Sequence, residues 1–231
     1  MWHIATFHPV SLVSLKLATA TSTGGKSVLL PTPFAVKMAL LNVVIQDSGL
    51  ESGKAIWESL RDAQVAVRGP DWISVNNTFT KILKPMKDKP SFDPETGLTR
   101  SMIKTIGFRE YVQWRGDLRI ALQLRTEQPP HWMRWFTLVN YLGKRGGFIQ
   151  ASGEYCETET LDADFVSLSQ PAQGFLLNGT MQIMDDCSSS LTFEHVDIYS
   201  EKKVERVYRH VAIPYRMVSS SRSYSLYQRL G

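Results

Sequence analysis

A short run of glycines and cations, Gly143-Lys144-Arg145-Gly146-Gly147, combines two features that phosphate binding requires. Glycines allow the backbone to approach a ligand closely and to present its N–H groups. The adjacent lysine and arginine supply the positive charge that attracts phosphates. The same run also suits a helix C-cap followed by a hairpin turn. The motif alone therefore leaves phosphate binding and a plain turn equally open.

Residues 76–108 alternate cations with apolar side chains, in a stretch interrupted by prolines and glycine. This pattern predicts a long β-hairpin with a loose tip, because long weakly apolar segments inside a compact domain are usually functional or disordered. Cations hold phosphates while apolar side chains stack on or separate bases, so the hairpin suits single-stranded RNA. An arm that contacts another subunit is an alternative, and the two are compatible. The cations are Lys81, Lys84, Lys87, Lys89, Arg100 and Lys104, and the apolar residues are Phe79, Met86, Phe92, Met102 and Phe108.

Other candidate sites are weaker. Gly24-Gly25-Lys26-Ser27 resembles the end of a phosphate-binding P-loop, but Ala20 stands where that motif needs its first glycine. We therefore reject nucleotide hydrolysis and keep Lys26 as a phosphate contact from a loop. The five histidines are scattered without metal-ligand or catalytic-triad spacing, and Asp185-Asp186 has no third carboxylate nearby in the sequence. We expect no metal and no cofactor.

The composition is that of a soluble globular protein. Hydrophobic residues make up 43% of the 231 residues, enough to form a core. No apolar stretch approaches the roughly 18 residues that a membrane helix needs, and the N-terminus does not resemble a secretory signal. Two cysteines, Cys156 and Cys187, form neither a disulfide framework nor a zinc motif. These features predict a cytoplasmic protein with no membrane partner.

Charge is strongly segregated along the chain, although the net charge is only +4. The local net charge is +1 over residues 1–75, +7 over 76–150, −9 over 151–200 and +5 over 201–231. Segregation of this kind suggests a region that faces a polyanion and an acidic region that faces something else. Solvated faces that cluster by chance are the alternative.

The order of predicted elements is strand, helix, strand, hairpin, strand, helix, strand. Residues 2–17 suit a strand, Thr32 caps a helix over 34–45 that Gly49 can end, and a second helix follows over 52–61. Strand patterns follow at 63–68 and 109–125, then a short helix over 131–140 with Trp132, Trp135, Phe136 and Val139 on its inner side. This order matches the α+β plan of ferredoxin-like and RRM-like domains.

The C-terminal part has the pattern of a β-rich region. Strands are predicted at 164–168, 174–184, 190–199 and 204–218, with Glu201-Lys202-Lys203 as the turn of the last hairpin. The serine-rich residues 219–223 predict a loose arm. We divide the chain into an RRM-like domain over 1–150, with the hairpin inserted at about 76–108, and a β-rich portion over 151–231 packed on it.

Three ordered segments give this sequence a resemblance to a known family. They are the first helix with its proline-threonine entry, Leu30-Pro31-Thr32-Pro33-Phe34-Ala35-Val36-Lys37-Met38-Ala39-Leu40-Leu41, the strand Arg109-Glu110-Tyr111-Val112 ahead of Asp117-Leu118-Arg119-Ile120-Ala121-Leu122, and the loop Tyr141-Leu142-Gly143-Lys144-Arg145-Gly146. Together they span about 120 residues and resemble the CRISPR-associated RAMP superfamily, and within it the Cas-five type of subunit of type I Cascade complexes. Residues 150–231 match no named pattern, and the tryptophan-glycine segment of some members is absent.

The resemblance implies a non-catalytic subunit in antiviral defence. It would hold the 5′ handle of a crRNA, use the hairpin as a thumb, contact the filament subunit and the large subunit, and meet target DNA only indirectly. It adds Lys37, Arg109 and Tyr111 to the RNA-binding candidates. The full set is Lys26, Lys37, Lys81, Lys84, Lys87, Arg100, Lys104, Phe108, Arg109, Tyr111, Gly143, Lys144, Arg145 and Gly146.

Two other functions compete with handle binding. One branch of the superfamily cuts crRNA with Tyr, Lys and His, but no such trio maps onto this chain at matching positions. A metal-independent endoribonuclease is therefore a minority hypothesis. An RRM-like RNA-binding protein outside CRISPR systems is the other. The C-terminal Arg206, Arg209, Arg216 and Arg222 could give a second RNA contact or meet an acidic partner.

Overall fold

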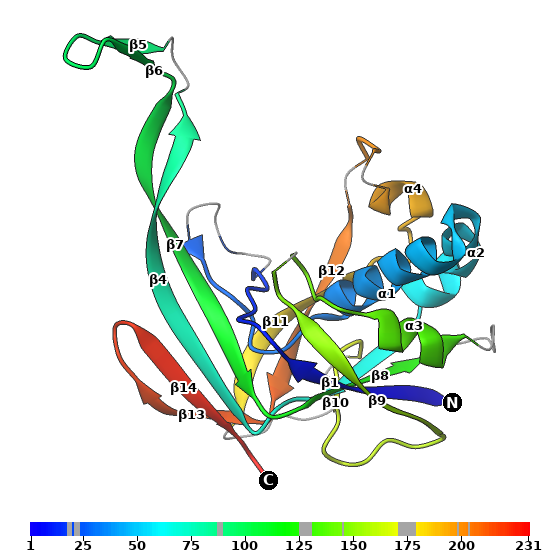
Figure 1. Ribbon diagram of the computed structural model, residues 1–231. Helices are drawn as coiled ribbons and strands as arrows, with labels where there is room; N and C mark the ends of the chain where they lie inside the picture. Colours follow the sequence, from blue (N-terminus) through cyan, green and yellow to red (C-terminus); the bar gives the residue numbers. More distant parts are fainter. Residues whose placement is uncertain are drawn as a thin grey trace.

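Figure 1 shows the computed structural model of the chain, which is an α+β protein built mainly from antiparallel sheets. The structure describes residues 1–17, 20, 24–86, 90–124, 131–144, 146–170, 179–197, 199–202 and 204–231. Within these, the side chains of Gly24 and Arg100 are also outside the description. Predictions for Lys87, Lys89 and Arg145, and for the side chain of Arg100, therefore lie outside the described residues.

The first sheet has five strands in the order β10-β3-β8-β1-β9, all antiparallel to their neighbours. The strands are β1 (Trp2–Pro9), β3 (Gln64–Arg68), β8 (Leu118–Gln123), β9 (Ile149–Thr158) and β10 (Val166–Ser167). β1 lies between β8 and β9, so the first strand of the chain is central. Phe7, Val65, Leu118 and Leu122 are fully buried, because one face of this sheet packs on the helices.

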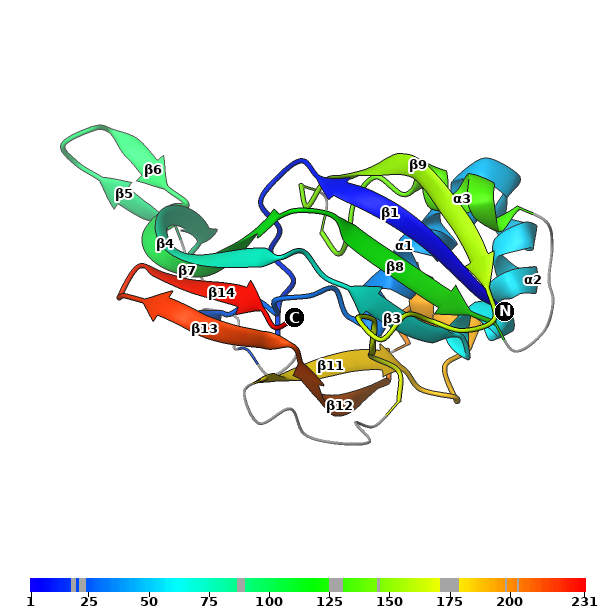
Figure 2. The ribbon, with the colours of Figure 1, turned by 90° about the horizontal axis from the view of Figure 1, so that it is seen from below.

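Three helices cover one face of this sheet. Figure 2 shows the molecule from below, with the strands in front of the helices. They are α1 (Pro33–Ser48), α2 (Leu50–Arg61) and α3 (Trp132–Leu138). The side chain of Thr32 accepts a hydrogen bond from the Ala35 backbone N–H at 3.2 Å, and Gly49 ends α1 with a φ of 87°. The predicted cap, helix end and inner residues of α3 are thus confirmed, with Trp132, Trp135, Phe136 and Val139 all buried.

The second sheet has the order β13-β14-β4-β7-β2 and carries the long hairpin. Its strands are β2 (Gly24–Gly25), β4 (Trp72–Pro85), β7 (Met102–Arg115), β13 (Tyr215–Ser220) and β14 (Tyr224–Arg229). β4 and β7 pair without interruption from Trp72↔Arg115 to Pro85↔Met102 and rise out of the body (Figure 1). The small strands β5 (Ser91–Asp93) and β6 (Leu98–Arg100) form its tip. The structure thus has a projecting hairpin where the sequence predicts one.

A third layer, the two-stranded sheet of β11 (Thr180–Cys187) and β12 (Arg206–Ile213), packs against α1. Helix α1 is therefore enclosed between this sheet and the first one. A single cluster of buried apolar residues runs through these layers, from Phe7 and Val65 through Leu40 and Val44 to Met184 and Ile213.

Two predictions for the C-terminal part are wrong. Residues 190–199 contain the short helix α4 (Phe193–Val196), held by a reciprocal cap between Thr192 and His195, and not a strand. Glu201 and Lys202 accordingly lie between α4 and β12. Residues 221–223 form the turn between β13 and β14 and not part of a loose arm, because β14 pairs with β4 from Trp72↔Gln228 to Asn76↔Tyr224.

Candidate nucleic-acid interface

The hairpin has two faces, because side chains alternate along each strand. The inner face is the one whose side chains, nearest the body, are part of the core. These are Ile73, Val75, Val112 and Trp114. Farther from the body, this face carries paired residues in the register Phe79↔Phe108, Lys81↔Ile106 and Leu83↔Lys104.

Aromatic and charged groups alternate in space on the outlying part of the inner face. The rings of Phe79 and Phe108 lie 5.2 Å apart with a tilt of 54°, and the Phe79 side chain is 67% exposed. Lys81 and Lys104 are both exposed farther along the hairpin. The arrangement provides apolar surfaces for bases and cations for phosphates.

The root of the hairpin is joined to the loop that carries Lys26. β2 runs parallel to β7, with Gly24 and Gly25 opposite Phe108 and Arg109. A Cβ on Gly25 would lie 2.7 Å from the carbonyl oxygen of Phe108, so only glycine permits this approach. The backbone N–H of Ser27 donates to Glu110 Oε2 at 2.8 Å. Lys26 is therefore held, exposed, beside the hairpin root.

The glycine-rich loop over residues 143–147 turns sharply between Tyr141 and Phe148, which form a bridge. Gly143 and Gly146 have φ angles of 71° and 108°, a region that favours glycine. The backbone N–H of Gly147 donates to the carbonyl of Lys144 at 3.1 Å. Lys144 is exposed at this turn, so the loop is both a tight turn and a place where a cation reaches solvent.

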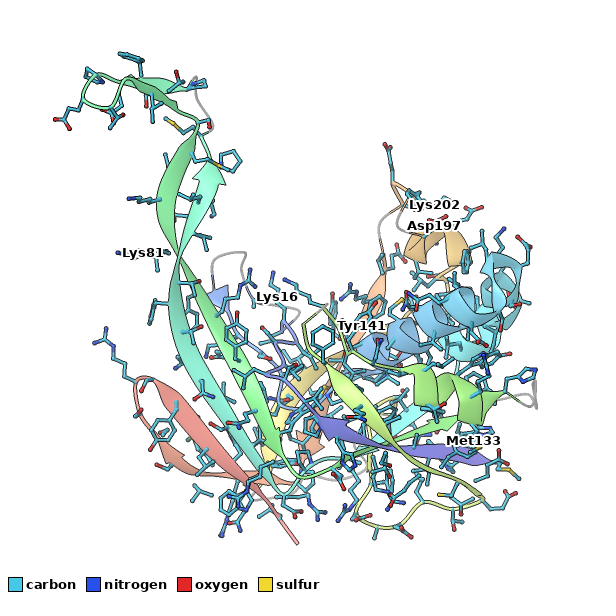
Figure 3. All side chains as sticks on the ribbon, in the orientation of Figure 1. Lys16, Lys81, Met133, Tyr141, Asp197 and Lys202 are labelled. Atoms are coloured by element: carbon cyan, nitrogen blue, oxygen red, sulfur yellow. The ribbon has the colours of Figure 1, made fainter. Side chains whose placement is uncertain are left out.

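Leu15 brings the glycine-rich loop and the hairpin root together. A Cβ on Gly143 would lie 2.5 Å from Leu15 Cδ2, and the backbone N–H of Leu15 donates to the Ser27 hydroxyl oxygen at 3.0 Å. The next residue, Lys16, is exposed and forms a bridge with Ser27. Figure 3 shows Lys16 and Tyr141 in the space between the hairpin and the helices. We call Lys16, Lys26, Phe108 and Lys144 the hairpin-root surface.

Lys16 was missed in the sequence because it stands alone in an apolar stretch. The available signal was its position just before the Thr/Ser/Gly-rich loop that ends with Lys26. Two cations at the two ends of a closed loop must lie near each other, and the bridge Lys16↔Ser27 closes this one.

Three candidates lie on the opposite, outer face of the hairpin. Arg109 pairs with Thr78, Tyr111 with Asn76 and Lys84 with Ile103, and these pairs alternate with the inner-face pairs. Arg109 and Tyr111 are half-buried, while Lys84 is exposed. The candidates of residues 81–111 therefore do not form one surface.

Lys37 does not lie on any surface that RNA can reach. Its side chain is 1% exposed, and its Nζ donates to Asp186 Oδ1 at 2.6 Å and to the carbonyl of Arg61 at 2.7 Å. The partners are a carboxylate on β11 and the backbone carbonyl of the last residue of α2. We therefore remove Lys37 from the RNA-binding candidates.

The C-terminal arginines divide into two groups. Arg206 pairs with Asp185 at 2.7 Å, and Arg209 pairs with Asp186 at 3.2 Å. The sequence left open an RNA contact or an acidic partner for these arginines. For Arg206 and Arg209 the acidic partner is present, and it belongs to the same chain. Arg216 and Arg222 are exposed instead.

One cluster of titratable groups lies near the start of β1, at the end of the sheet away from the hairpin (Figure 1). His3 Nδ1 and the Tyr155 hydroxyl are 2.7 Å apart, and that hydroxyl donates to Glu157 Oε1 at 2.8 Å. Burial lowers the pKa of His3 and raises the pKa of Tyr155, so both groups are held neutral.

The described residues contain no group of three or more His, Cys, Asp or Glu side chains that could hold a metal ion. In the same residues no helix has the length and apolar character needed to cross a membrane. Burial raises the pKa of Cys187 to about 12, so this thiol stays protonated at neutral pH.

A comparison with curated proteins finds a relative in Archaeoglobus fulgidus. The CRISPR-associated protein Cas5 of that organism is 28% identical over 143 residues, which are 62% of this chain and 59% of the relative. The match thus spans less than two thirds of the relative's length. A crystal structure of a CRISPR protein from the same organism aligns with all of this chain and 92% of its own, with 16% identity and a TM-score of 0.47. No family model matches the chain.

Proposed function

We propose that this chain is a CRISPR-associated protein of the Cas5 type, like the relative it resembles, and that it binds the 5′ handle of a crRNA through the hairpin-root surface. The observation that carries this proposal is that the segments bearing Lys16, Lys26 and Lys144 meet at Leu15 and Ser27, near the aromatic pair at the root of the hairpin.

Each part of this surface has a physical role in the proposal. The three ammonium groups neutralise phosphates, and counterions released from the RNA add a salt-dependent gain in affinity. Phe79 and Phe108 offer exposed ring surface on which a base can stack or against which two bases can be separated. Gly143 and Gly146 let the backbone come close to the RNA.

We further propose a ferredoxin-like arrangement for the body, as in RAMP proteins. The strand order β9-β1-β8-β3, with helices on one face after β1 and after β8, supports it. In this view the β4–β7 hairpin is the thumb of a domain over residues 1–150, and residues 151–231 pack on it. The continuous apolar core supports a close association of the two parts.

The proposed setting is a Cascade complex in the cytoplasm. There the hairpin would contact a filament subunit, the body would contact the large subunit, and target DNA would be met only through them. The exposed apolar residues along the hairpin support a protein contact, since such surface is costly in a free chain. They are Phe79, Leu83, Phe92, Leu98, Met102, Ile103 and Ile106.

We also propose that the subunit does not cut RNA. The cluster of His3 and Tyr155 lies at the far end of the first sheet from the hairpin, and this separation supports the proposal. Incubation of the protein with a labelled CRISPR repeat RNA in EDTA tests it. The RNA is expected to stay intact, and a specific cut that His3→Ala abolishes would contradict the proposal.

The binding proposal is tested by filter binding of the purified protein to a 5′ handle RNA and to a scrambled RNA across a salt series. Lys16→Ala and Lys144→Ala are each expected to weaken handle binding and to reduce the salt slope by about 1. Lys54→Ala is the matched control, because Lys54 is an exposed lysine on α2 that pairs with Glu51. Equal losses for all three variants, or no preference of the native protein for the handle, would contradict handle recognition at this surface.

A further inference from the structure

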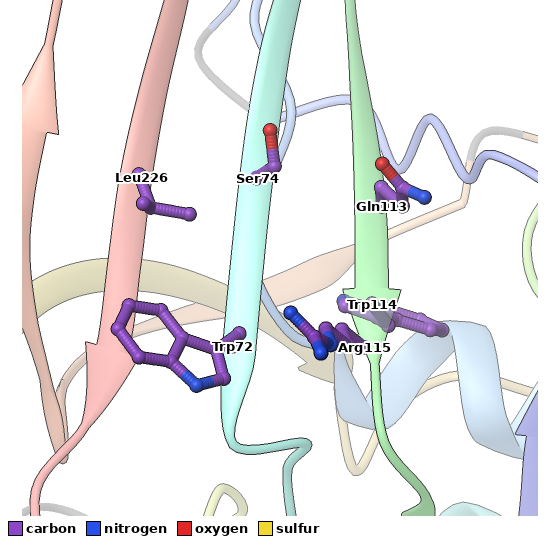
Figure 4. Close-up of a pocket in the computed structure, with 6 residues that line it drawn as sticks. All are labelled: Trp72, Ser74, Gln113, Trp114, Arg115 and Leu226. Carbon is purple, nitrogen blue, oxygen red and sulfur yellow. The ribbon is translucent and has the colours of Figure 1, made fainter.

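The outer face of the second sheet contains a pocket close to the body. It has a volume of about 510 Å³ and is lined by Trp72, Ser74, Gln113, Trp114, Arg115 and Leu226 (Figure 4). Strands β14, β4 and β7 each contribute to it. Trp72 and Arg115 are register partners, and Leu226 lies opposite Ser74.

The pocket side chains form a platform with polar groups around it. The indole of Trp72 and the side chain of Leu226 are half-buried, while Gln113 and Arg115 are exposed. Figure 4 shows the Trp72 ring beside the Arg115 side chain, with Ser74 and Gln113 above them. An indole ring offers a flat apolar surface, and the hydroxyl and amide can both donate and accept hydrogen bonds.

The charge of this face is positive over its whole length. Arg109 and Arg115 on β7 and Lys84 on β4 point to the same side, and Arg216 lies opposite Gln228 on the neighbouring strand pair. None of the side chains on this side of β4, β7 and β14 is acidic. The nearby Asp71 is paired with Arg229, and Glu110 lies on the inner face, where it accepts from Ser27.

We infer that this outer face is a second RNA-binding site for a single-stranded RNA. One base of the strand stacks on Trp72, and phosphates of the same strand meet Arg115 and Arg109. An apolar platform with cations on either side is the arrangement that proteins use for single strands. The absence of acidic side chains on these strands favours a polyanion over a protein partner. The Ser74 hydroxyl and the Gln113 amide can bond to a ribose 2′-hydroxyl, which favours RNA over DNA.

This site is separate from the hairpin-root surface. Phe108 faces the inner side, whereas Arg109 and Tyr111 face the outer side. Each face presents its own cations and its own aromatic groups. An RNA strand bound at the root can therefore be held at both faces of the hairpin, or two strands can be held separately.

The test uses fluorescence anisotropy of a labelled single-stranded RNA with the 231-residue chain and five variants. Trp72→Ala is expected to weaken binding about tenfold, because a base loses its stacking partner. Trp72→Phe keeps a ring and should lose less. Gln113→Glu places a negative charge on an exposed side chain without disturbing the core, so it should weaken binding in a correctly folded protein. Gln46→Glu makes the same change on an exposed glutamine of α1 and should bind like the native protein.

Binding by Gln113→Glu that equals binding by Gln46→Glu would overturn the inference, whatever Trp72→Ala does to folding. If Gln113→Glu lowers the affinity for a DNA strand of the same sequence as much as it lowers the affinity for the RNA, the assignment to RNA is overturned. Lys144→Ala separates this site from the proposed function. If Lys144→Ala binds the handle normally while Gln113→Glu weakens RNA binding, the hairpin-root proposal fails and the outer-face inference stands. If Lys144→Ala weakens handle binding while Gln113→Glu binds RNA like the native protein, the outer-face inference fails and the hairpin-root proposal stands.

Discussion

At the scale of single residues, the buried ion pairs show how far a side chain's role depends on what surrounds it. Asp186 accepts from Lys37 Nζ, from an Arg209 guanidinium nitrogen and from the Cys187 backbone N–H. Two cations and one amide therefore satisfy one buried carboxylate. Removing one member leaves charge in a place that water does not reach, which costs more than losing a surface pair.

We expect Lys37→Met to lower the free energy of unfolding by about 3 kcal/mol, since it leaves Asp186 less compensated. Its affinity for RNA, measured on the folded fraction, should equal that of the native protein. Urea denaturation and filter binding on the same preparation check both statements. Weaker RNA binding without a loss of stability would return Lys37 to the RNA-binding set.

A second residue-scale prediction concerns pH. Burial lowers the pKa of His3 below its value of 6.5 in an unfolded chain. Below pH 6.5 the unfolded chain takes up a proton at His3 that the folded protein does not, so stability falls as the pH drops from 7 toward the folded pKa. His3→Gln should flatten this dependence in urea unfolding at pH 5, 6 and 7. His210→Gln, at an exposed histidine, should leave the dependence in place.

Whether a cation is exposed or buried could be predicted from the sequence only where the residues that surround it are also near in the sequence. Lys144 sits among glycines, and its exposure follows from the turn they make. Lys37 was misplaced although a signal existed. Its helix is apolar on all sides, with Val36, Leu40, Val43 and Val44 buried, and a helix of that kind is enclosed. The partner Asp186 lies 149 residues away and could not be named from sequence.

At the scale of elements, the hairpin is a root packed in the body and an outlying part without a core. The root strands are buried at Ile73, Val75, Val112 and Trp114, whereas the β4 residues from Thr80 to Pro85 are all exposed. An isolated two-stranded ribbon is only marginally stable by itself. The root thus holds the position of the hairpin, and the outlying part adds surface.

Replacement of residues 81–106 by Asn-Gly should therefore change the free energy of unfolding by less than about 1 kcal/mol, since the shortened strands can close with a two-residue turn. The shortened protein loses Lys81, Lys104 and the apolar residues between them, so its affinity for single-stranded RNA should fall. Thermal unfolding and filter binding measure the two effects. If the shortened protein binds single-stranded RNA as tightly as the native protein, the prediction is wrong and the RNA contacts are confined to the root of the hairpin.

Most elements could be predicted from local pattern, and the failures share one cause. The hairpin, the caps of α1 and the inner residues of α3 were readable, because periodicity, prolines and glycines act within a few residues. The serine-rich stretch before β14 was not, because β14 forms on the edge of β4, about 150 residues earlier in the chain. A strand that depends on so distant a partner leaves little local pattern.

At the scale of the whole molecule, segments of opposite charge meet in the third layer. The acidic β11 and the basic β12 pair with each other, and Asp185 and Asp186 form ion pairs with Arg206 and Arg209. Part of the −9 and part of the +5 along the sequence therefore cancel inside the protein. Among the described cations of the hairpin, Lys81, Lys84 and Lys104 are all exposed, so positive charge remains at the surface on the hairpin side.

The C-terminal hairpin ties this layer to the second sheet, and its removal should affect the entire protein. A chain that ends at Ser220 loses β14 and its backbone pairing with Trp72–Asn76. We expect the free energy of unfolding to fall by about 3 kcal/mol or more, since each lost backbone hydrogen bond contributes about 1 kcal/mol. Differential scanning calorimetry checks this. A truncated protein as stable as the full chain would mean that residues 221–231 are a loose arm after all.

Within the part of the chain that the structure describes, the outlying part of the hairpin also has two strand edges that pair with no other strand. β14 pairs with β4 only as far as Asn76, and β2 pairs with β7 only at Phe108 and Arg109. The backbone N–H of Asn77 still donates to the carbonyl of Ser223 at 2.8 Å, but beyond it the outward-facing backbone groups are open to another strand, a condition that promotes edge-to-edge aggregation. Lys81, Lys84 and Lys104 stand on these edges, and mutual repulsion between copies keeps them apart. The lysines that would attract RNA thus also keep the free subunit from polymerising, and chemical acetylation of the protein should turn a clear solution into fibrous aggregate.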